Sequence, residues 1–167
     1  FTSFTPYMKI SPEKLDELIK IVHLAGIEII KIYKKKVTKK YKSDNTPVTN
    51  ADIRANEIIC KGLKLHFPEI SIVSEEQVKK GKATKKFWLV DPLDGTKEFL
   101  KGNGEFTVNI GLIENKKPVF GIIYMPTKNK LYFTKDKKSY FSKLSKKGQL
   151  SNIRKIKVKK RNKNIVI

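Results

Sequence analysis

Four acidic residues stand where the sequence predicts the ends of helices and strands: Asp52, Glu75, Asp91 and Asp94. Asp91 directly follows a short apolar run with strand character, and Glu75 follows another such run. If the two strands are neighbours, both carboxylates emerge at the same end of one sheet. Clustered carboxylates repel one another, and a divalent cation relieves that repulsion. Because the set contains neither His nor Cys, it favours a hard cation, with Mg²⁺ preferred when phosphate is the other ligand.

The residues that follow Asp91 predict a phosphate-binding segment beside the acidic cluster. The Pro92-Leu93 step predicts a turn that brings Asp94 back beside Asp91, and Gly95 then precedes a short helix over residues 96–100. The first N–H groups of a helix have no carbonyl partner within it, so they favour an anion. A metal bound here would lower the pKa of a water ligand and stabilise charge on the oxygens of a transferring phosphoryl group.

Each acidic residue alone has a simpler interpretation. Two Asp residues in a turn are usually only solvated, Glu75 is consistent with a charged strand end, and Asp52 is consistent with an acid in the first turn of a helix. Their combination in this order, at element ends, indicates a site.

The elements that must position these residues are two helices followed by strands. Ser11-Pro12-Glu13 predicts a helix start, and apolar residues recur at helical spacing as far as Tyr33. Residues 49–52 predict the capping box of a second helix that runs to about His66. Strands are then predicted over residues 70–74, 87–90, 106–113, 119–125, 130–134 and 139–144. This order predicts an α+β fold, an antiparallel sheet covered by a pair of long helices.

Composition indicates a globular protein with a strongly basic surface. The net charge is +21, but only three of the 37 basic residues are arginine, the residue that binds phosphate and guanine bidentately. The scattered lysines therefore favour solubilising charge over a nucleic-acid surface. Cys60, the single cysteine, is expected to be a core residue in a reducing compartment, and His23 a structural histidine.

The hexapeptide at residues 91–96, with Trp88-Leu89-Val90 before it and residues 74–76 upstream, resembles the signature of the inositol monophosphatase superfamily. Residues 42–52 and 94–110 resemble its 3′(2′),5′-bisphosphate nucleotidases of the CysQ type. Lys97-Glu98-Phe99 supports the latter, because inositol monophosphatases typically differ there.

The resemblance implies a layered α/β sandwich, of which this chain is the N-terminal domain, and a site with two or three Mg²⁺ ions. Its implied metal ligands are Glu75, Asp91, the carbonyl of Leu93, and Asp94. The catalytic residues would be Asp52 and Thr96, which orient and deprotonate the attacking water. The implied substrate-binding residues are Glu75, Leu93, Asp94, Gly95 and Thr96.

The implied reaction is hydrolysis of the 3′-phosphate of adenosine 3′,5′-bisphosphate to AMP and phosphate, in sulfur assimilation or nucleotide salvage. Residues 8–152 would form the metal-binding domain, and residues 153–167 would begin the crossing to a C-terminal domain that is absent. The isolated chain is therefore expected to be weakly active or inactive. The implied location is the cytoplasm, with peripheral contact to the cytoplasmic face of the inner membrane left open.

Two alternatives remain at this point. One is a phosphatase of the same superfamily that acts on an inositol phosphate or a sugar bisphosphate. The other is a basic nucleic-acid-binding protein whose acidic motif is vestigial. The leading interpretation expects a small nucleoside bisphosphate as partner and no nucleic acid. It leaves the oligomeric state open.

Overall fold

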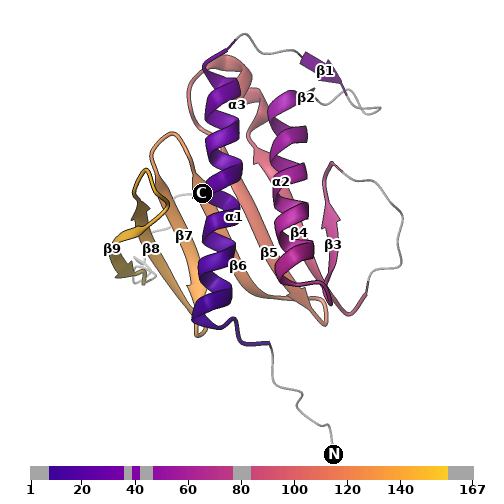
Figure 1. The fold of residues 1–167 in the computed structure, drawn as a ribbon, viewed down its shortest axis with the longest axis vertical. Coiled ribbons are helices and arrows are strands. Elements are labelled where there is room, and N and C mark those ends of the chain that lie inside the picture. Colours follow the sequence, from indigo (N-terminus) through magenta and orange to yellow (C-terminus); the bar gives the residue numbers. More distant parts are fainter. Residues whose placement is uncertain (1–7, 36–38, 42–46, 77–83, 158–167) are drawn as a thin grey trace, which may run out of the picture.

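The fold, seen in a computed structural model, pairs two long helices with a seven-stranded sheet (Figure 1). The structure describes residues 8–35, 39–41, 47–76 and 84–157. Part of the segment on which the nucleotidase resemblance rests, residues 42–46, lies outside these ranges.

Both long helices begin at the predicted caps. Helix α1 (Pro12–Tyr33) has Ser11 as its N-cap, and the Ser11 side chain accepts a hydrogen bond from the backbone N–H of Lys14 at 3.3 Å. Helix α2 (Asn50–His66) begins at Thr49 with a capping box, in which the N–H of Thr49 donates to Asp52. Because caps satisfy N–H groups that lack a partner within the helix, these local signals predict the two starts correctly.

The sheet has the strand order β3-β4-β5-β6-β7-β8-β9. The strands are β3 (Ser71–Ser74), β4 (Lys86–Asp94), β5 (Thr107–Glu114), β6 (Lys117–Met125), β7 (Lys130–Lys135), β8 (Lys138–Leu144) and β9 (Leu150–Lys155). The prediction of an antiparallel sheet holds for every pair except the first, because β3 and β4 run parallel. Strand β9 was not predicted, and it includes residue 153, from which the resemblance implies a crossing to a C-terminal domain.

Helices α1 and α2 lie side by side across one face of the sheet (Figure 1). Helix α1 packs on β5 and β6, whereas α2 packs on β3 and β4. Strand β5 alternates buried and partly exposed residues, so every second side chain points into the core beneath the helices. Trp88 is fully buried there, with edge-on contacts to Phe67 and Phe120. The sheet thus turns one face toward the helices and the other away from them.

Three shorter elements complete the described chain. Strands β1 (Lys39–Tyr41) and β2 (Pro47–Thr49) form a separate antiparallel pair, which the sequence did not predict. Helix α3 (Thr96–Lys101) contacts β2 and corresponds to the predicted short helix. None of the helices in the described ranges is both long and apolar enough to cross a membrane.

Cys60 and His23 occupy structural positions, as predicted. The Cys60 side chain is buried in α2, and its thiol donates to Oδ1 of Asn56 at 3.3 Å. The His23 ring is buried against Tyr124, and its Nε2 lies 3.3 Å from the carbonyl oxygen of Lys146. Both side chains therefore contribute to packing.

Candidate active site

Glu75 and Asp91 follow two adjacent parallel strands. The register of β3 on β4 ends with Ser74 opposite Val90, so Glu75 and Asp91 come next at the same end. The N–H of Glu75 donates to the carbonyl of Val90 at 3.1 Å, which continues the ladder by one residue. The two strands are therefore neighbours, as a common cluster of Glu75 and Asp91 requires.

The Pro92-Leu93 step does not form the predicted turn. Strand β4 continues through Asp94, with Asp91 opposite Asn109 and Asp94 opposite Thr107, and the register shifts between them. From Asp91 to Asp94 the chain advances three residues on β4 but only two on β5, which is a β-bulge. Pro92 lies within the bulge and has no N–H to donate to a regular ladder. Opposed residues share a face and strand residues two apart share a face. The bulge therefore brings Asp91 and Asp94 to one face of the sheet, although they are three residues apart.

The strand ends that bear Glu75, Asp91 and Asp94 form the acidic edge of the sheet, and the pKa of Asp91 is raised there. Burial and, after it, the negative charges of Glu75 and Asp94 together raise this pKa to about 7. A hydrogen bond between the carboxyl groups of Asp91 and Glu75 also raises the pKa, while the N–H of Leu93, 3.2 Å from Oδ1, opposes it. A divalent cation bound at these carboxylates would relieve the repulsion that raises the pKa of Asp91.

The residues present fit a hard cation by their chemistry. Every donor is an oxygen, and among the residues that the structure describes, the charges that act on the pKa of Asp91 are the negative charges of Glu75 and Asp94. Within the described residues, however, no three side chains of His, Cys, Asp or Glu converge into a group that could hold a metal ion. The three carboxylates interact but do not form a closed cage.

A pH titration of stability tests the strain at Asp91. The pKa of an unfolded Asp is about 3.9, so the folded protein binds an extra proton between about pH 4 and pH 7. In EDTA, the contribution of Asp91 to the free energy of unfolding should therefore fall as pH rises through that window and level off above it. Asp91→Asn should remove this loss and stabilise the protein at pH 8 by about 1–3 kcal/mol, after allowance for the partial exposure of the side chain. Urea unfolding of both proteins at pH 5 and pH 8 measures the difference, and an equal difference at both pH values would contradict this assignment.

The predicted catalytic residues, Asp52 and Thr96, are in contact. Asp52 is 2% exposed, and its Oδ1 accepts a hydrogen bond from Oγ1 of Thr96 at 3.0 Å. Its Oδ2 accepts from the N–H of Thr49 at 2.8 Å and from the Thr49 hydroxyl at 2.5 Å. Burial raises the pKa of Asp52, against the lowering effect of these hydrogen bonds. The first turn of α2 is thereby joined to the segment that follows β4.

Gly95 makes the reversal that places Thr96 against Asp52. Its φ of +96° lies in the left-handed region, and a Cβ there would sit 2.8 Å from the carbonyl oxygen of Glu105. Any side chain at this position is therefore both strained and obstructed by backbone.

Gly95→Ala should accordingly cost at least about 2 kcal/mol of stability, because a strained backbone and a steric contact add. Gly102→Ala is the matched control, since Gly102 also has a positive φ, +79°, but a Cβ there would meet nothing within 4 Å. It should lose only the conformational part, about 1 kcal/mol. Urea denaturation compares the two, and equal losses would show that the contact with Glu105 is unimportant.

Two supporting contacts were missed in the sequence. Oγ of Ser74 donates to Oδ1 of Asn56 at 2.6 Å, which ties the end of β3 to α2 just before Glu75. Nδ2 of Asn109 donates to Oδ2 of Asp94 at 3.0 Å. Asn56 follows Asp52 by four residues, one turn along the same face of the helix, so the sequence could have predicted that Asn56 lies near the site. The role of Asn109 could not be predicted, because it depends on the register of the strands.

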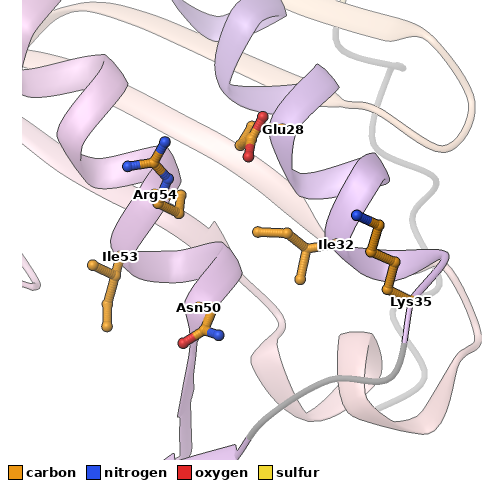
Figure 2. A pocket seen from close by; sticks show the side chains of 6 residues that line it. All are labelled: Glu28, Ile32, Lys35, Asn50, Ile53 and Arg54. Carbon is orange, nitrogen blue, oxygen red and sulfur yellow. The ribbon is translucent and has the colours of Figure 1, made fainter.

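A pocket of about 360 Å³ lies between the end of α1 and the start of α2 (Figure 2). Its lining residues are Glu28, Ile32, Lys35, Asn50, Ile53 and Arg54. Each residue turns a helix by roughly 100°, so Asp52 points about 100–200° away from Asn50, Ile53 and Arg54, the three pocket residues on α2. The pocket is therefore separate from the acidic edge and contains none of the predicted site residues.

The family of the chain follows from comparison with known proteins. Residues 12–166 match the profile of the inositol monophosphatase family. The chain belongs to that family. The resemblance seen in the sequence is thereby confirmed, and so is the α+β fold class, since a solved bacterial member of the family shares the fold.

Similar members of the inositol monophosphatase family are named as bisphosphate nucleotidases. The 3′(2′),5′-bisphosphate nucleotidase CysQ of Buchnera aphidicola is 50% identical over 123 residues, 71% of this chain and 46% of that protein. The protein of the same name from Escherichia coli K12 is 42% identical over 131 residues, 75% of this chain and 53% of that protein. The chain thus spans about half the length of these relatives.

Solved structures match the chain over a similar share of their length. CysQ from Bacteroides thetaiotaomicron superposes with a TM-score of 0.64 at 39% identity, over 76% of this chain and 48% of that chain. The extragenic suppressor protein suhB from Bartonella henselae gives 0.69 at 28% identity, over 76% and 51%. The matched portion is again about half of each solved chain.

Proposed function

We propose that this family member provides the metal-binding half of a phosphomonoesterase that removes the 3′-phosphate from adenosine 3′,5′-bisphosphate. The observation that carries the proposal is the hydrogen bond between Asp52 and Thr96, beside the strand ends that bear Glu75 and Asp91. The substrate class is supported by the names of relatives at 42–50% identity. The proposed compartment is the cytoplasm, and the proposed products are AMP and phosphate.

Glu75, Asp91, Asp94 and the carbonyl of Leu93 are the proposed ligands of Mg²⁺, with two or three ions in the complete site. The negative charges of Glu75 and Asp94, which raise the pKa of Asp91, support this choice. When bound, Mg²⁺ would lower the pKa of a water ligand and stabilise negative charge on the phosphoryl oxygens. A hard cation also accounts for a ligand set made only of oxygen.

Asp52 and Thr96 are the proposed catalytic pair. The Thr96 hydroxyl has one proton, and its oxygen lies 3.0 Å from Asp52 and 3.2 Å from the carbonyl of Leu93. When Thr96 donates to Asp52, the lone pairs of its oxygen remain able to accept a hydrogen bond from the attacking water. Asp52, whose pKa burial raises, is then the base that takes the proton through Thr96.

Phosphate is proposed to bind at the backbone N–H groups of Gly95 and Thr96, with Glu75, Leu93 and Asp94 also contacting the substrate. The left-handed turn at Gly95 supports this role, because it admits backbone close to a ligand where a side chain would not fit. Phosphate at this position would lie beside the acidic edge, so the proposed metal and phosphate sites are adjacent.

The deciding experiment is hydrolysis by a protein of the relatives' full length that carries this sequence as its N-terminal half. Phosphate release in Mg²⁺ should be fastest with adenosine 3′,5′-bisphosphate and slower with inositol 1-phosphate and fructose 1,6-bisphosphate. Preference for either of the other esters would replace the proposed substrate by that of another branch of the family.

Metal binding by the 167-residue chain separates the enzyme from the nucleic-acid-binding alternative. Mg²⁺ should raise the melting temperature and change the fluorescence of Trp88, the single tryptophan, which lies on β4 three residues before Asp91. If Mg²⁺ changes neither signal and the chain binds DNA with strong salt dependence, the acidic motif is vestigial.

A further inference from the structure

Asn109, on β5, reaches the acidic edge through a side-chain hydrogen bond. It lies directly opposite Asp91 in the β4–β5 register, and its Nδ2 donates to Oδ2 of Asp94 at 3.0 Å. The bulge in β4 puts Asp91 and Asp94 on its face of the sheet. One amide thus stands between two of the proposed metal ligands.

The orientation of this amide follows from charge. If the amide were flipped, the oxygen of Asn109 would point at the carboxylate of Asp94, and two hydrogen-bond acceptors would lie against each other. Nδ2 therefore points to Asp94, and Oδ1 points away from it. Oδ1 is buried and has no hydrogen-bond partner among the residues that the structure describes.

A buried carbonyl oxygen without a donor weakens the fold, and an apolar side chain of similar shape would avoid that penalty. The exposed neighbour on β6, Ile123, shows that this face of the sheet accepts apolar side chains. The asparagine is therefore unfavourable for the fold by itself, and what it provides is the contact with Asp94. The water shell of a cation or a substrate hydroxyl is the kind of donor that its Oδ1 lacks.

We propose that Asn109 is a positioning residue of the cation site, which holds the Asp94 carboxylate in the orientation that binds Mg²⁺. This inference rests on the proposed function, since it presumes a cation at the acidic edge. Outer partners of metal ligands typically change metal affinity by 10–100-fold. Asn109 acts through Asp94, so its effect should disappear when Asp94 cannot bind.

The test is isothermal titration of the 167-residue chain with Mg²⁺, alongside its melting temperature in EDTA. Asn109→Leu and Asn109→Ala should each weaken Mg²⁺ binding by about 10–100-fold. Asn109→Leu should leave the melting temperature in EDTA unchanged or higher, because the unsatisfied oxygen is gone. Asn129→Ala is the matched control: Asn129 accepts a hydrogen bond from the Tyr124 hydroxyl at 3.0 Å on another hairpin, so its loss should lower the melting temperature and leave Mg²⁺ affinity unchanged.

A second measurement keeps the proposal testable whatever the stability of one variant. In an Asp94→Asn background, adding Asn109→Ala should change cation affinity by less than about 2-fold, since residues that act as a unit are not additive. Mn²⁺ binding, counted from the electron paramagnetic resonance of the free ion, gives this comparison. If the wild type binds neither Mg²⁺ nor Mn²⁺, the proposed function fails. If the wild type binds and both Asn109 variants bind equally well, only the role of Asn109 is overturned.

Discussion

Mg²⁺ binding by the chain should be lost in Asp91→Asn, with an increase in Kd of more than about 100-fold, beyond the 10–100-fold typical of an outer partner. Asp91 is the residue that interacts with both other acidic side chains: Glu75 and Asp94 each raise its pKa. The amide is isosteric and can still accept the N–H of Leu93, so the local backbone has no reason to change. What disappears is one negative charge at the centre of the cluster.

The same substitution should stabilise the metal-free protein at pH 8, as derived above from the raised pKa of Asp91. A residue whose removal strengthens the fold and abolishes ligand binding is under functional rather than structural constraint. Asp136→Asn is the matched control, because Asp136 lies on the β7–β8 hairpin, paired with Lys9 at 3.1 Å, and should leave Mg²⁺ affinity unchanged. Titration calorimetry measures both variants. Binding by Asp91→Asn with the affinity of the wild type would contradict the proposed ligand set.

The second large effect is expected at Asp52. In a protein of the relatives' full length, Asp52→Asn should lower kcat by about 10²–10⁴-fold, the range for a general base. Two Thr49 donors converge on Oδ2 of Asp52, so an asparagine would turn its oxygen to them and its amide toward Thr96. The hydrogen bond at 3.0 Å would then reverse, and the side chain could not accept a proton.

Mg²⁺ affinity should be nearly unchanged in Asp52→Asn, which separates it from Asp91→Asn. Asp16→Asn, at an exposed acidic residue on α1, and Lys138→Ala, on the β7–β8 hairpin, are controls that should retain both activity and metal affinity. Initial rates at saturating substrate, with calorimetry in parallel, give the comparison. A kcat of Asp52→Asn close to that of the wild type would remove Asp52 from the proposed mechanism.

Local signals were sufficient for the helices and for most of the strands. Ser11 and Thr49 cap their helices as predicted, because capping involves only residues within one turn. The apolar runs predicted the strands of the main sheet up to β8, since alternation along a strand reflects one buried face. The acidic residues were also evident, because Glu75 and Asp91 each follow such a run directly. Strands β1 and β2 were missed because each has only three residues, and β9 was missed because it is largely polar.

The sequence alone determined the residue types, their order and the family to which the motif points, because each of these is a property of neighbouring residues. Only the tertiary structure decided how the residues meet. The parallel pairing of β3 and β4, the bulge that replaces the expected turn, and the contact of Asp52 with Thr96 all join distant segments. The register of β5 decided the role of Asn109 in the same way, since a shift by one residue would have turned its side chain to the opposite face.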